Sequence, residues 1–271
     1  MASPDRRPPG TRHTGAVVAA VTLTGRAVRL EPLAMHHVDA LVAAASESRA
    51  PYAYAMVPDG RDAMEAYVAA ALRERQAGRQ LPFATVLLGP AASDAGPAGV
   101  DDVAGRSGDR RRGEGSATPG AGRRVVGRDG GRAGRVVGST RFDDIAAWTW
   151  PAGHTHERSG VPDAVEIGGT WLASSARRTV VNTEAKYLML VHAFEVWRVH
   201  RVRLRTDVRN EVSRRAIERI GARFEGVLRA DRPGADGTVR DSALFSVVAA
   251  EWPGVRAQLE ERLAVPASGP A

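Results

Sequence analysis

The 271-residue sequence contains no cysteine. This absence excludes disulfides, thiolate nucleophiles, iron–sulfur ligation and cysteine-based zinc sites. The sequence also lacks any apolar stretch near the roughly 20 residues that a membrane-spanning helix needs. The short apolar run at 16–23 is not followed by the cleavage pattern of a signal peptide. We therefore expect a soluble, cytoplasmic protein without a membrane partner.

Lysine is almost as scarce, since Lys186 is the only one. The net charge of +7 therefore comes from arginine. A basic surface gains affinity for nucleic acid by releasing phosphate counterions, but an arginine bias also arises from codon composition alone. We do not expect a specific nucleic-acid role, and an arginine-rich tether for nucleic acid is kept as a minor alternative.

The distribution of apolar residues indicates one domain with an interruption. Residues 89–134 are dominated by Gly, Ala, Arg, Asp and Ser, with almost no large apolar side chains. Such a stretch cannot bury enough surface to order itself, so we predict a disordered insertion. The domain itself is predicted over residues 22–263, with disordered tails at 1–21 and 264–271.

A four-residue sequence, Arg-Val-Val-Gly, occurs at 124–127 and again at 135–138. The second copy continues in an alternating pattern through Phe142, whereas the first runs into Gly-rich sequence. Alternation of this kind is typical of a half-buried strand. We therefore assign the strand to 136–142.

Hydrophobic periodicity and turn residues predict an alternating order of strands and helices. Gly78 and Gly221 are placed to end two of the helices. The predicted strands are 28–30, 82–88, 136–142, 164–172, 201–207 and a closing hairpin of 224–228 with 239–248, and the predicted helices are 37–45, 64–77, 183–197 and 210–220.

The most informative segment is Arg177–Lys186, which lies between the strand 164–172 and a strongly apolar helix. A helix N-terminus carries unpaired N–H groups and the positive end of a dipole, so it attracts anions before any side chain acts. This placement predicts a phosphate-bearing cofactor. The alternative is a solvated loop that Asn182 or Thr183 caps.

The sequence resembles the GNAT superfamily of acyl-CoA N-acyltransferases, and within it the branch of ribosomal-protein N-terminal acetyltransferases. The resemblance covers about residues 22–263 apart from the insertion. It implies an α/β fold with a mixed, mostly antiparallel twisted sheet flanked by helices. It is carried by Glu166-Ile167-Gly168, Asn182–Lys186, Asn210–Ser213, Ile217–Ala222, Arg240–Ser242 and the opening Leu23–Leu33.

The resemblance implies that the loop binds the pyrophosphate of coenzyme A through backbone amides. Its pattern of Arg or Gln, two residues, Gly, one residue, then Gly or Ala falls on Arg177, Val180 and Asn182. If Val180 adopted the left-handed conformation of the missing glycine, the strain would cost roughly 1 to 2 kcal/mol. This departure motivates the alternative of a weakly active or inactive acyl-CoA-binding regulatory protein. The implied cofactor-binding residues are Trp171, Leu172, Arg177, Arg178, Thr179, Val180, Val181, Asn182, Thr183 and Asn210.

Acyl transfer to an amine requires a neutral amine, a polarised thioester carbonyl and a proton for the departing thiolate. The resemblance implies that Glu166 is the general base, acting through water, and that Ser213 protonates the sulfur. Amides near Trp171 and Leu172 would polarise the carbonyl. Glu166 could instead be a salt-bridged strand residue, and Ser213 could only serve the start of its helix.

These implications define an N-acetyltransferase that uses acetyl-CoA as co-substrate and no metal. The acceptor is a primary amine, either a protein N-terminus or a small molecule, and it attacks directly without a covalent enzyme intermediate. A homodimer is an open possibility. His154 and His156 with Glu157 could suggest a metal ligand set, but a solvated loop is the preferred interpretation.

Overall fold

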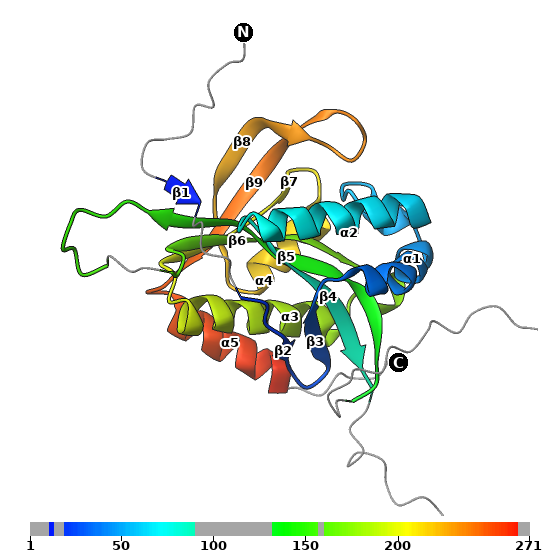
Figure 1. Ribbon diagram of the computed structural model, residues 1–271, viewed down its shortest axis with the longest axis horizontal. Helices are drawn as coiled ribbons and strands as arrows, with labels where there is room; N and C mark the ends of the chain where they lie inside the picture. The colour runs from blue at the N-terminus through cyan, green and yellow to red at the C-terminus, as the bar shows by residue number, and fades with distance from the viewer. Residues whose placement is uncertain (1–10, 14–18, 90–131, 157–159, 265–271) are drawn as a thin grey trace, which may run out of the picture.

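One twisted sheet organises the protein (Figure 1). The structure is a computed structural model that describes residues 11–13, 19–89, 132–156 and 160–264. Its strands are β1 (Thr11–His13), β2 (Leu23–Thr24), β3 (Val28–Pro32), β4 (Leu81–Leu88), β5 (Gly134–Trp148), β6 (Ala164–Leu172), β7 (Arg201–Asp207), β8 (Arg223–Pro233) and β9 (Val239–Val248). Its α-helices are α1 (Val38–Ser46), α2 (Arg61–Gln76), α3 (Val180–Val191), α4 (Glu211–Arg219) and α5 (Trp252–Ala264), with a short 3-10 turn η2 at Ala50–Tyr52.

The strands follow the order β2-β3-β4-β5-β6-β7-β9-β8, and β1 pairs with the end of β5. All neighbours are antiparallel except β6 and β7, which run parallel. A parallel pair needs a crossover connection, which α3 provides. The predicted mixed, mostly antiparallel sheet flanked by helices is confirmed.

Helices cover both faces of the sheet, with α1 and α2 on one face and α3, α4 and α5 on the other (Figure 1). Side chains of β5 point alternately to these two faces. The hydroxyl of Ser139 lies 3.2 Å from that of Tyr67 on α2. The ring of Phe142 points the other way and lies 4.6 Å from the ring of Trp197, beyond the end of α3. Phe142 is fully buried and belongs to the core between sheet and α3.

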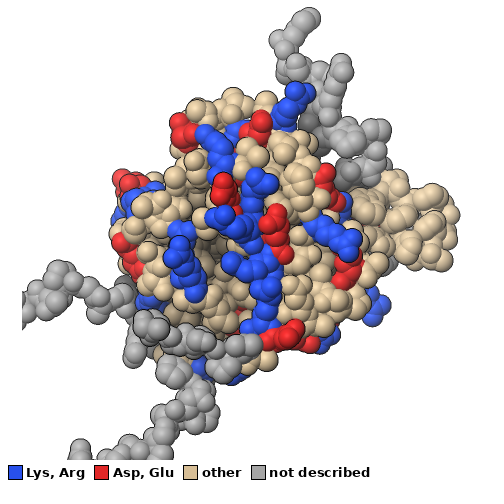
Figure 2. Space-filling model, turned by 180° about the vertical axis from the view of Figure 1, so that it is seen from behind, with Lys and Arg blue, Asp and Glu red and all other residues tan. Residues whose placement is uncertain are grey.

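The charged residues of this arginine-rich chain are mixed in sign on the face that Figure 2 shows. On the side opposite the view of Figure 1, basic and acidic side chains alternate, and basic ones border a hollow near the centre of the face (Figure 2). Clustered cations beside a hollow attract anionic ligands. Among the described helices, none has the length and apolarity needed to cross a membrane.

Several predicted boundaries shift in the structure. Strand β7 and strand β6 have the predicted bounds, and β5 contains the predicted 136–142 but is longer at both ends. Helix α3 begins at Val180 instead of 183, because Thr179 caps it, and it ends as a π-helical turn at His192–Val196. Helix α5 was not predicted, and Thr11–His13 forms β1 inside the segment predicted to be a tail. The first Arg-Val-Val-Gly copy and insertion residues 90–131 lie outside the described residues.

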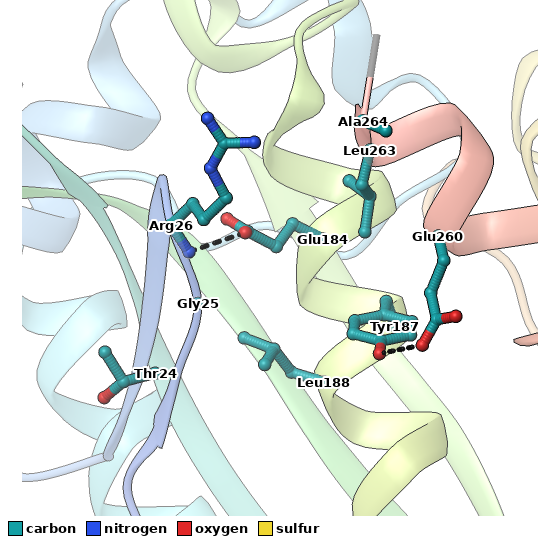
Figure 3. A pocket seen from close by; sticks show the side chains of 9 residues that line it. All are labelled: Thr24, Gly25, Arg26, Glu184, Tyr187, Leu188, Glu260, Leu263 and Ala264. Atoms are coloured by element: carbon teal, nitrogen blue, oxygen red, sulfur yellow. Dashed lines mark hydrogen bonds between the residues drawn. The ribbon is translucent and has the colours of Figure 1, made fainter.

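One buried carboxylate joins α3 to the opposite end of the sheet. Glu184 accepts hydrogen bonds from the backbone N–H groups of Arg26 at 2.7 Å and Ala27 at 2.8 Å, in the turn between β2 and β3 (Figure 3). The turn leaves no room beside it, since a Cβ at Gly25 would lie 2.6 Å from the Glu184 carboxylate. Hydrogen bonds to an ionised acceptor are stronger than neutral ones. Glu184 therefore fixes the position of α3 relative to the β2–β3 turn of the sheet.

Replacement of Glu184 by alanine leaves the Arg26 and Ala27 amides without their acceptor. We expect Glu184→Ala to lower the free energy of unfolding by about 2 kcal/mol, and Glu184→Gln by about half as much, because the amide keeps one acceptor oxygen. Urea unfolding followed by circular dichroism measures both. Glu261→Ala, at an exposed position on α5, is the control and should change stability by less than about 0.5 kcal/mol. Equal effects of Glu184→Ala and Glu261→Ala would contradict this role.

Candidate active site

The sheet opens between β6 and β7. The two strands pair only over Ala164–Glu166 and Arg201–Arg203. Beyond that point β6 continues to Leu172 beside β5, and β7 continues to Asp207 beside β9. The two strands are parallel, so the gap opens at their carboxyl ends, where α3 and α4 also begin. Such a crevice outside the carboxyl ends of parallel strands is a common place for ligands.

A bulge in β6 accompanies this opening. The register of β6 against β5 shifts between the pairs Arg141–Gly168 and Ser139–Trp171, which leaves one extra residue on β6. Gly169 takes up the bend with φ of 57°, and a Cβ there would lie 2.7 Å from a guanidinium nitrogen of Arg141. A bulge bends its strand and increases the local twist. Gly169 thus allows β6 to turn away from β7.

The bulge leaves one backbone N–H directed at the gap. The N–H of Ala173 donates to the Val137 carbonyl of β5 at 2.7 Å. Backbone groups alternate in direction along a strand, so the N–H and C=O of Leu172 point away from β5. The Leu172 carbonyl accepts the Tyr52 hydroxyl at 2.9 Å on that side. Of the two predicted residues, Trp171 turns its backbone groups toward β5, and Leu172 presents its N–H to the gap.

The predicted anion loop enters α3 beside the same gap. Thr179 is the N-cap, and its hydroxyl accepts the N–H of Val181 at 3.3 Å. The N–H groups of Thr179, Val180 and Asn182 have no protein acceptor among the described residues. Free amides at a helix N-terminus suit a phosphate group. Arg177, Arg178 and Thr183 lie in or beside this turn, and the loop residues before Val181 are partly or fully exposed.

Val180 does not have the left-handed backbone conformation considered for it from the sequence. This residue is the first of α3 and does not take a positive φ, so it carries no left-handed strain. The left-handed residue of the loop is Arg178, with φ of 60°. Its position directly before the N-cap turns the chain from the extended Arg177 into the helix. The left-handed strain considered for Val180 is therefore absent.

Glu166 lies at the bottom of the gap, where the pairing of β6 and β7 ends. Its side chain is buried, and its two oxygens accept hydrogen bonds from the Nε of Arg203 at 3.0 Å and the Nε of Arg205 at 2.8 Å. Asp144 forms a further ion pair with Arg203. A carboxylate has about four lone-pair sites, so two remain for a water molecule. The cluster holds Glu166 in one orientation.

The second parallel strand leads into α4 through a fixed turn. The buried Asp207 accepts hydrogen bonds from the backbone and guanidinium of Arg209. Asn210 then caps α4, accepting the Ser213 N–H with its Oδ1 at 3.0 Å. Asn210 is therefore the N-cap of α4. Ser213 is half-buried, and its hydroxyl makes no hydrogen bond within the described part of the chain.

Two tyrosines that the sequence did not single out connect both sides of the gap. Tyr52, in η2, bonds to the Leu172 carbonyl and lies edge-on to Trp171 with ring centroids 6.2 Å apart. Tyr54 lies under the guanidinium of Arg209, 5.0 Å from ring centroid to carbon. The segment between α1 and α2 therefore contacts both β6 and the turn that precedes α4. A loop without periodicity gave no pattern from which this could be predicted.

Other clusters lie away from the gap. His154 and Trp150 stack at 4.8 Å, and Glu157, the third member of the weighed metal set, lies outside the described residues. Glu31, His36 and His37 have ligand atoms within 4.8 Å of one another, but His37 uses both ring nitrogens, one for the Ala34 N–H and one for Glu31. The hydrogen bond from His37 lowers the pKa of Glu31 to about 2.

The hollow of Figure 3 is also separate from the gap. It has a volume of about 490 Å³ and is bounded by the β2–β3 turn, α3 and the end of α5. None of the predicted site residues lines it. The charged residues in its lining are Arg26, Glu184 and Glu260, and both carboxylates are engaged in hydrogen bonds within the protein.

Comparison with known proteins gives a consistent result. Residues 27–223 match the protein family described as acetyltransferase (GNAT) domain. No curated protein sequence gives a significant match. A solved structure from T. thermophilus, described as an acetyltransferase, is 29% identical with a TM-score of 0.60, covering 91% of this chain and 98% of that chain.

Two further structures share the fold. A GCN5-related N-acetyltransferase from Brucella melitensis is 24% identical with a TM-score of 0.64, covering 93% of this chain and 91% of that chain. Mycobacterium smegmatis RimJ, solved in complex with CoA-disulfide, is 21% identical with a TM-score of 0.57, covering 93% of this chain and 97% of that chain. At these identities the likeness concerns the fold.

The left-handed Arg178 leads to a prediction with a built-in control. Glycine relieves a positive φ that alanine does not, so we expect Arg178→Gly to be more stable than Arg178→Ala by about 1 kcal/mol. At the neighbouring Arg177, which is extended with φ of −79°, the order should reverse, because glycine only adds unfolded-state entropy there. Urea unfolding of the four variants measures both differences. The same order at both positions would contradict the assigned backbone.

Proposed function

Because this chain belongs to the GNAT acetyltransferase family, we propose that it transfers an acetyl group from acetyl-CoA to a primary amine. The acceptor we favour is the N-terminus of a protein, with a small amine as the other member of the class. The amine attacks the thioester directly, and no covalent enzyme intermediate forms. Membership of this family makes the chain an acyltransferase. Our proposal concerns the identity of the acceptor amine and the roles of the individual residues.

Three features converge at one edge of the sheet, and this convergence supports the proposal. The β6–β7 pairing stops at Glu166, the free amides of α3 begin just beyond β6, and α4 begins just beyond β7. The first turn of α3, with Arg177 and Arg178, would hold the pyrophosphate of acetyl-CoA. RimJ from M. smegmatis, which shares the fold, was solved with CoA-disulfide, and this supports the same ligand class here.

The chemistry follows from the groups around the gap. The Leu172 N–H would polarise the thioester carbonyl, because a preorganised donor stabilises the negative charge that develops on that oxygen. Glu166 would accept the proton of the attacking amine through a water on its remaining lone pairs. The free Ser213 hydroxyl would donate a proton to the departing sulfur, and Asn210 would contact the pantetheine arm. No step requires a metal.

The face bearing α1 and α2 supports a peptide acceptor. The indole N–H of Trp171 is buried and has no hydrogen-bond partner in the described structure. Buried donors are rarely left unpaired, and a small shift of the Tyr52 or Trp171 ring would open this N–H to a backbone carbonyl of an acceptor peptide. Tyr52 and Tyr54 lie on the same side. The alternative is a weakly active or inactive acyl-CoA-binding protein, and the backbone strain that would have favoured it is absent at Val180.

Turnover with defined acceptors tests the proposal. Acetyl-CoA is incubated with peptides that have a free α-amine, with the same peptides N-acetylated beforehand, and with a set of small primary amines. We expect free thiol release and an acetylated product with the free-amine peptides and none with the blocked ones. Tight acetyl-CoA binding without acetylation of any amine would favour the binding-protein alternative.

The role of Glu166 has a separate test. If Glu166 is the base, Glu166→Gln should lower kcat by about 100-fold, because general-base catalysis commonly contributes that much. Glu225→Gln is a matched control, since Glu225 also pairs with a strand arginine, Arg201, but on the outer strand β8. If Glu166→Gln kept a kcat within about threefold of wild type, Glu166 would be a structural ion-pair residue.

A further inference from the structure

The only lysine of the chain is buried against the bulge of β6. Lys186, on α3, is 5% exposed. Its Nζ donates hydrogen bonds to the hydroxyls of Thr140 on β5, at 3.1 Å, and of Thr170 on β6. The two hydroxyls are themselves 2.8 Å apart. Among the described residues no carboxylate forms an ion pair with this amine.

Such a placement is costly for a packing residue. An amine without a counter-charge loses its hydration when it is buried, and this burial lowers the pKa of Lys186 to about 7. Methionine has a similar length and fills apolar space without that cost. The polar end of Lys186 therefore has a role other than packing, and its two hydroxyl partners show where that role lies.

Both partners belong to the bulge that opens the gap. Thr170 follows Gly169, the residue with φ of 57°, and precedes Leu172 by two positions. Thr140 lies on β5 between Ser139 and Arg141, the two residues that border the register shift. Thr170 itself is exposed. Lys186 thus holds the bulge from the helix side.

Lys186 also shares its helix with the anion loop. It lies six residues after Val180 on α3, which corresponds to roughly 9 Å along the helix axis. Glu184 fixes the same helix to the β2–β3 turn. One rigid element therefore carries both the amides of its first turn and the support under the bulge.

Resting on the acetyl transfer proposed above, we propose that Lys186 is a positioning residue for the transfer step. Its two hydrogen bonds fix the Gly169–Thr170 bulge and so direct the Leu172 N–H toward the thioester carbonyl. Lys186 does not contact the cofactor. It acts through Thr170, and it links the pyrophosphate-binding turn of α3 to the position of the reacting carbonyl.

Loss of this positioning role should affect kcat much more than the KM for acetyl-CoA. The pyrophosphate is held by the first turn of α3, which does not need the bulge, so the KM for acetyl-CoA should stay within about threefold. The Leu172 N–H, in contrast, is no longer held in its orientation toward the thioester carbonyl. A displacement of about 1 Å can reduce a rate by about 100-fold. We therefore expect Lys186→Met to lower kcat by about 10- to 100-fold.

A set of variants tests the pathway through Thr170. Thr170→Val removes the same hydrogen bond from the other side and should reproduce the kcat loss, whereas Thr170→Ser keeps the hydroxyl and should retain activity within about threefold. Tyr187→Phe, next to Lys186 on α3, loses only an exposed hydrogen bond to Glu260 and is the control. If Lys186→Met fails to fold, the Thr170 pair carries the same test.

A direct spectroscopic readout is available because the lysine is unique. Protein grown with ¹³Cε-lysine gives one side-chain resonance, and we expect it to titrate near the folded-state pKa of about 7. Its surroundings are uncharged: Thr140, Thr170 and Met189 contact this network. Titratable and charged groups on the neighbouring elements have other partners: Arg141 is bound to Asp143, Glu184 is bound to the turn at Arg26, and His192 packs on Phe142.

Acetyl-CoA should shift this resonance in the wild type and not in Thr170→Val, because the signal passes through the bulge. A folded Lys186→Met or Thr170→Val with wild-type kcat would overturn the inference while wild-type turnover still stood. An unmoved resonance at saturating acetyl-CoA would also overturn it. If the wild type acetylated no amine, the proposed function would fail, and the resonance would still report whether the bulge senses the bound thioester.

Discussion

The site depends on one interruption in backbone pairing, the point after Glu166 and Arg203 where β6 and β7 stop exchanging hydrogen bonds. Two parallel strands that stayed paired would leave no room for a ligand between them. The bulge at Gly169 bends β6 away, and the pairing of β7 with β9 keeps the other strand in place. Everything attributed to catalysis lies at this opening, since α3 and α4 begin there and the Leu172 N–H faces it.

Helix α3 sets the geometry of the opening from behind the sheet. Its buried polar side chains have separate partners: Glu184 holds the β2–β3 turn, and Lys186 holds Thr140 and Thr170. Both are buried in a largely apolar helix face, where an unpaired polar group would be expensive. These contacts leave α3 little freedom to slide. The amides of its first turn are therefore presented at a fixed distance from the bulge.

Much of the fold followed from local patterns, and the parts that did not depended on tertiary contacts. The alternation in Arg201–Asp207 gave the bounds of β7 because one face of that strand is buried. The start of α3 was placed three residues late, since nothing local distinguished Thr179 from Asn182 as the cap. Tyr52 and Tyr54 come from a loop without period, and the partners of Lys186 are 16 and 46 residues away. Such contacts arise only when the sheet assembles.

We propose that acetyl-CoA occupies the gap between β6 and β7 with its pyrophosphate on the first turn of α3. Amide hydrogen exchange with and without acetyl-CoA measures this directly, because bound ligand protects the N–H groups it contacts. We expect increased protection at residues 168–183 and 210–213, with the β2–β3 turn and α5 around the hollow of Figure 3 unchanged. Protection confined to that hollow, or absent from the first turn of α3, would contradict it.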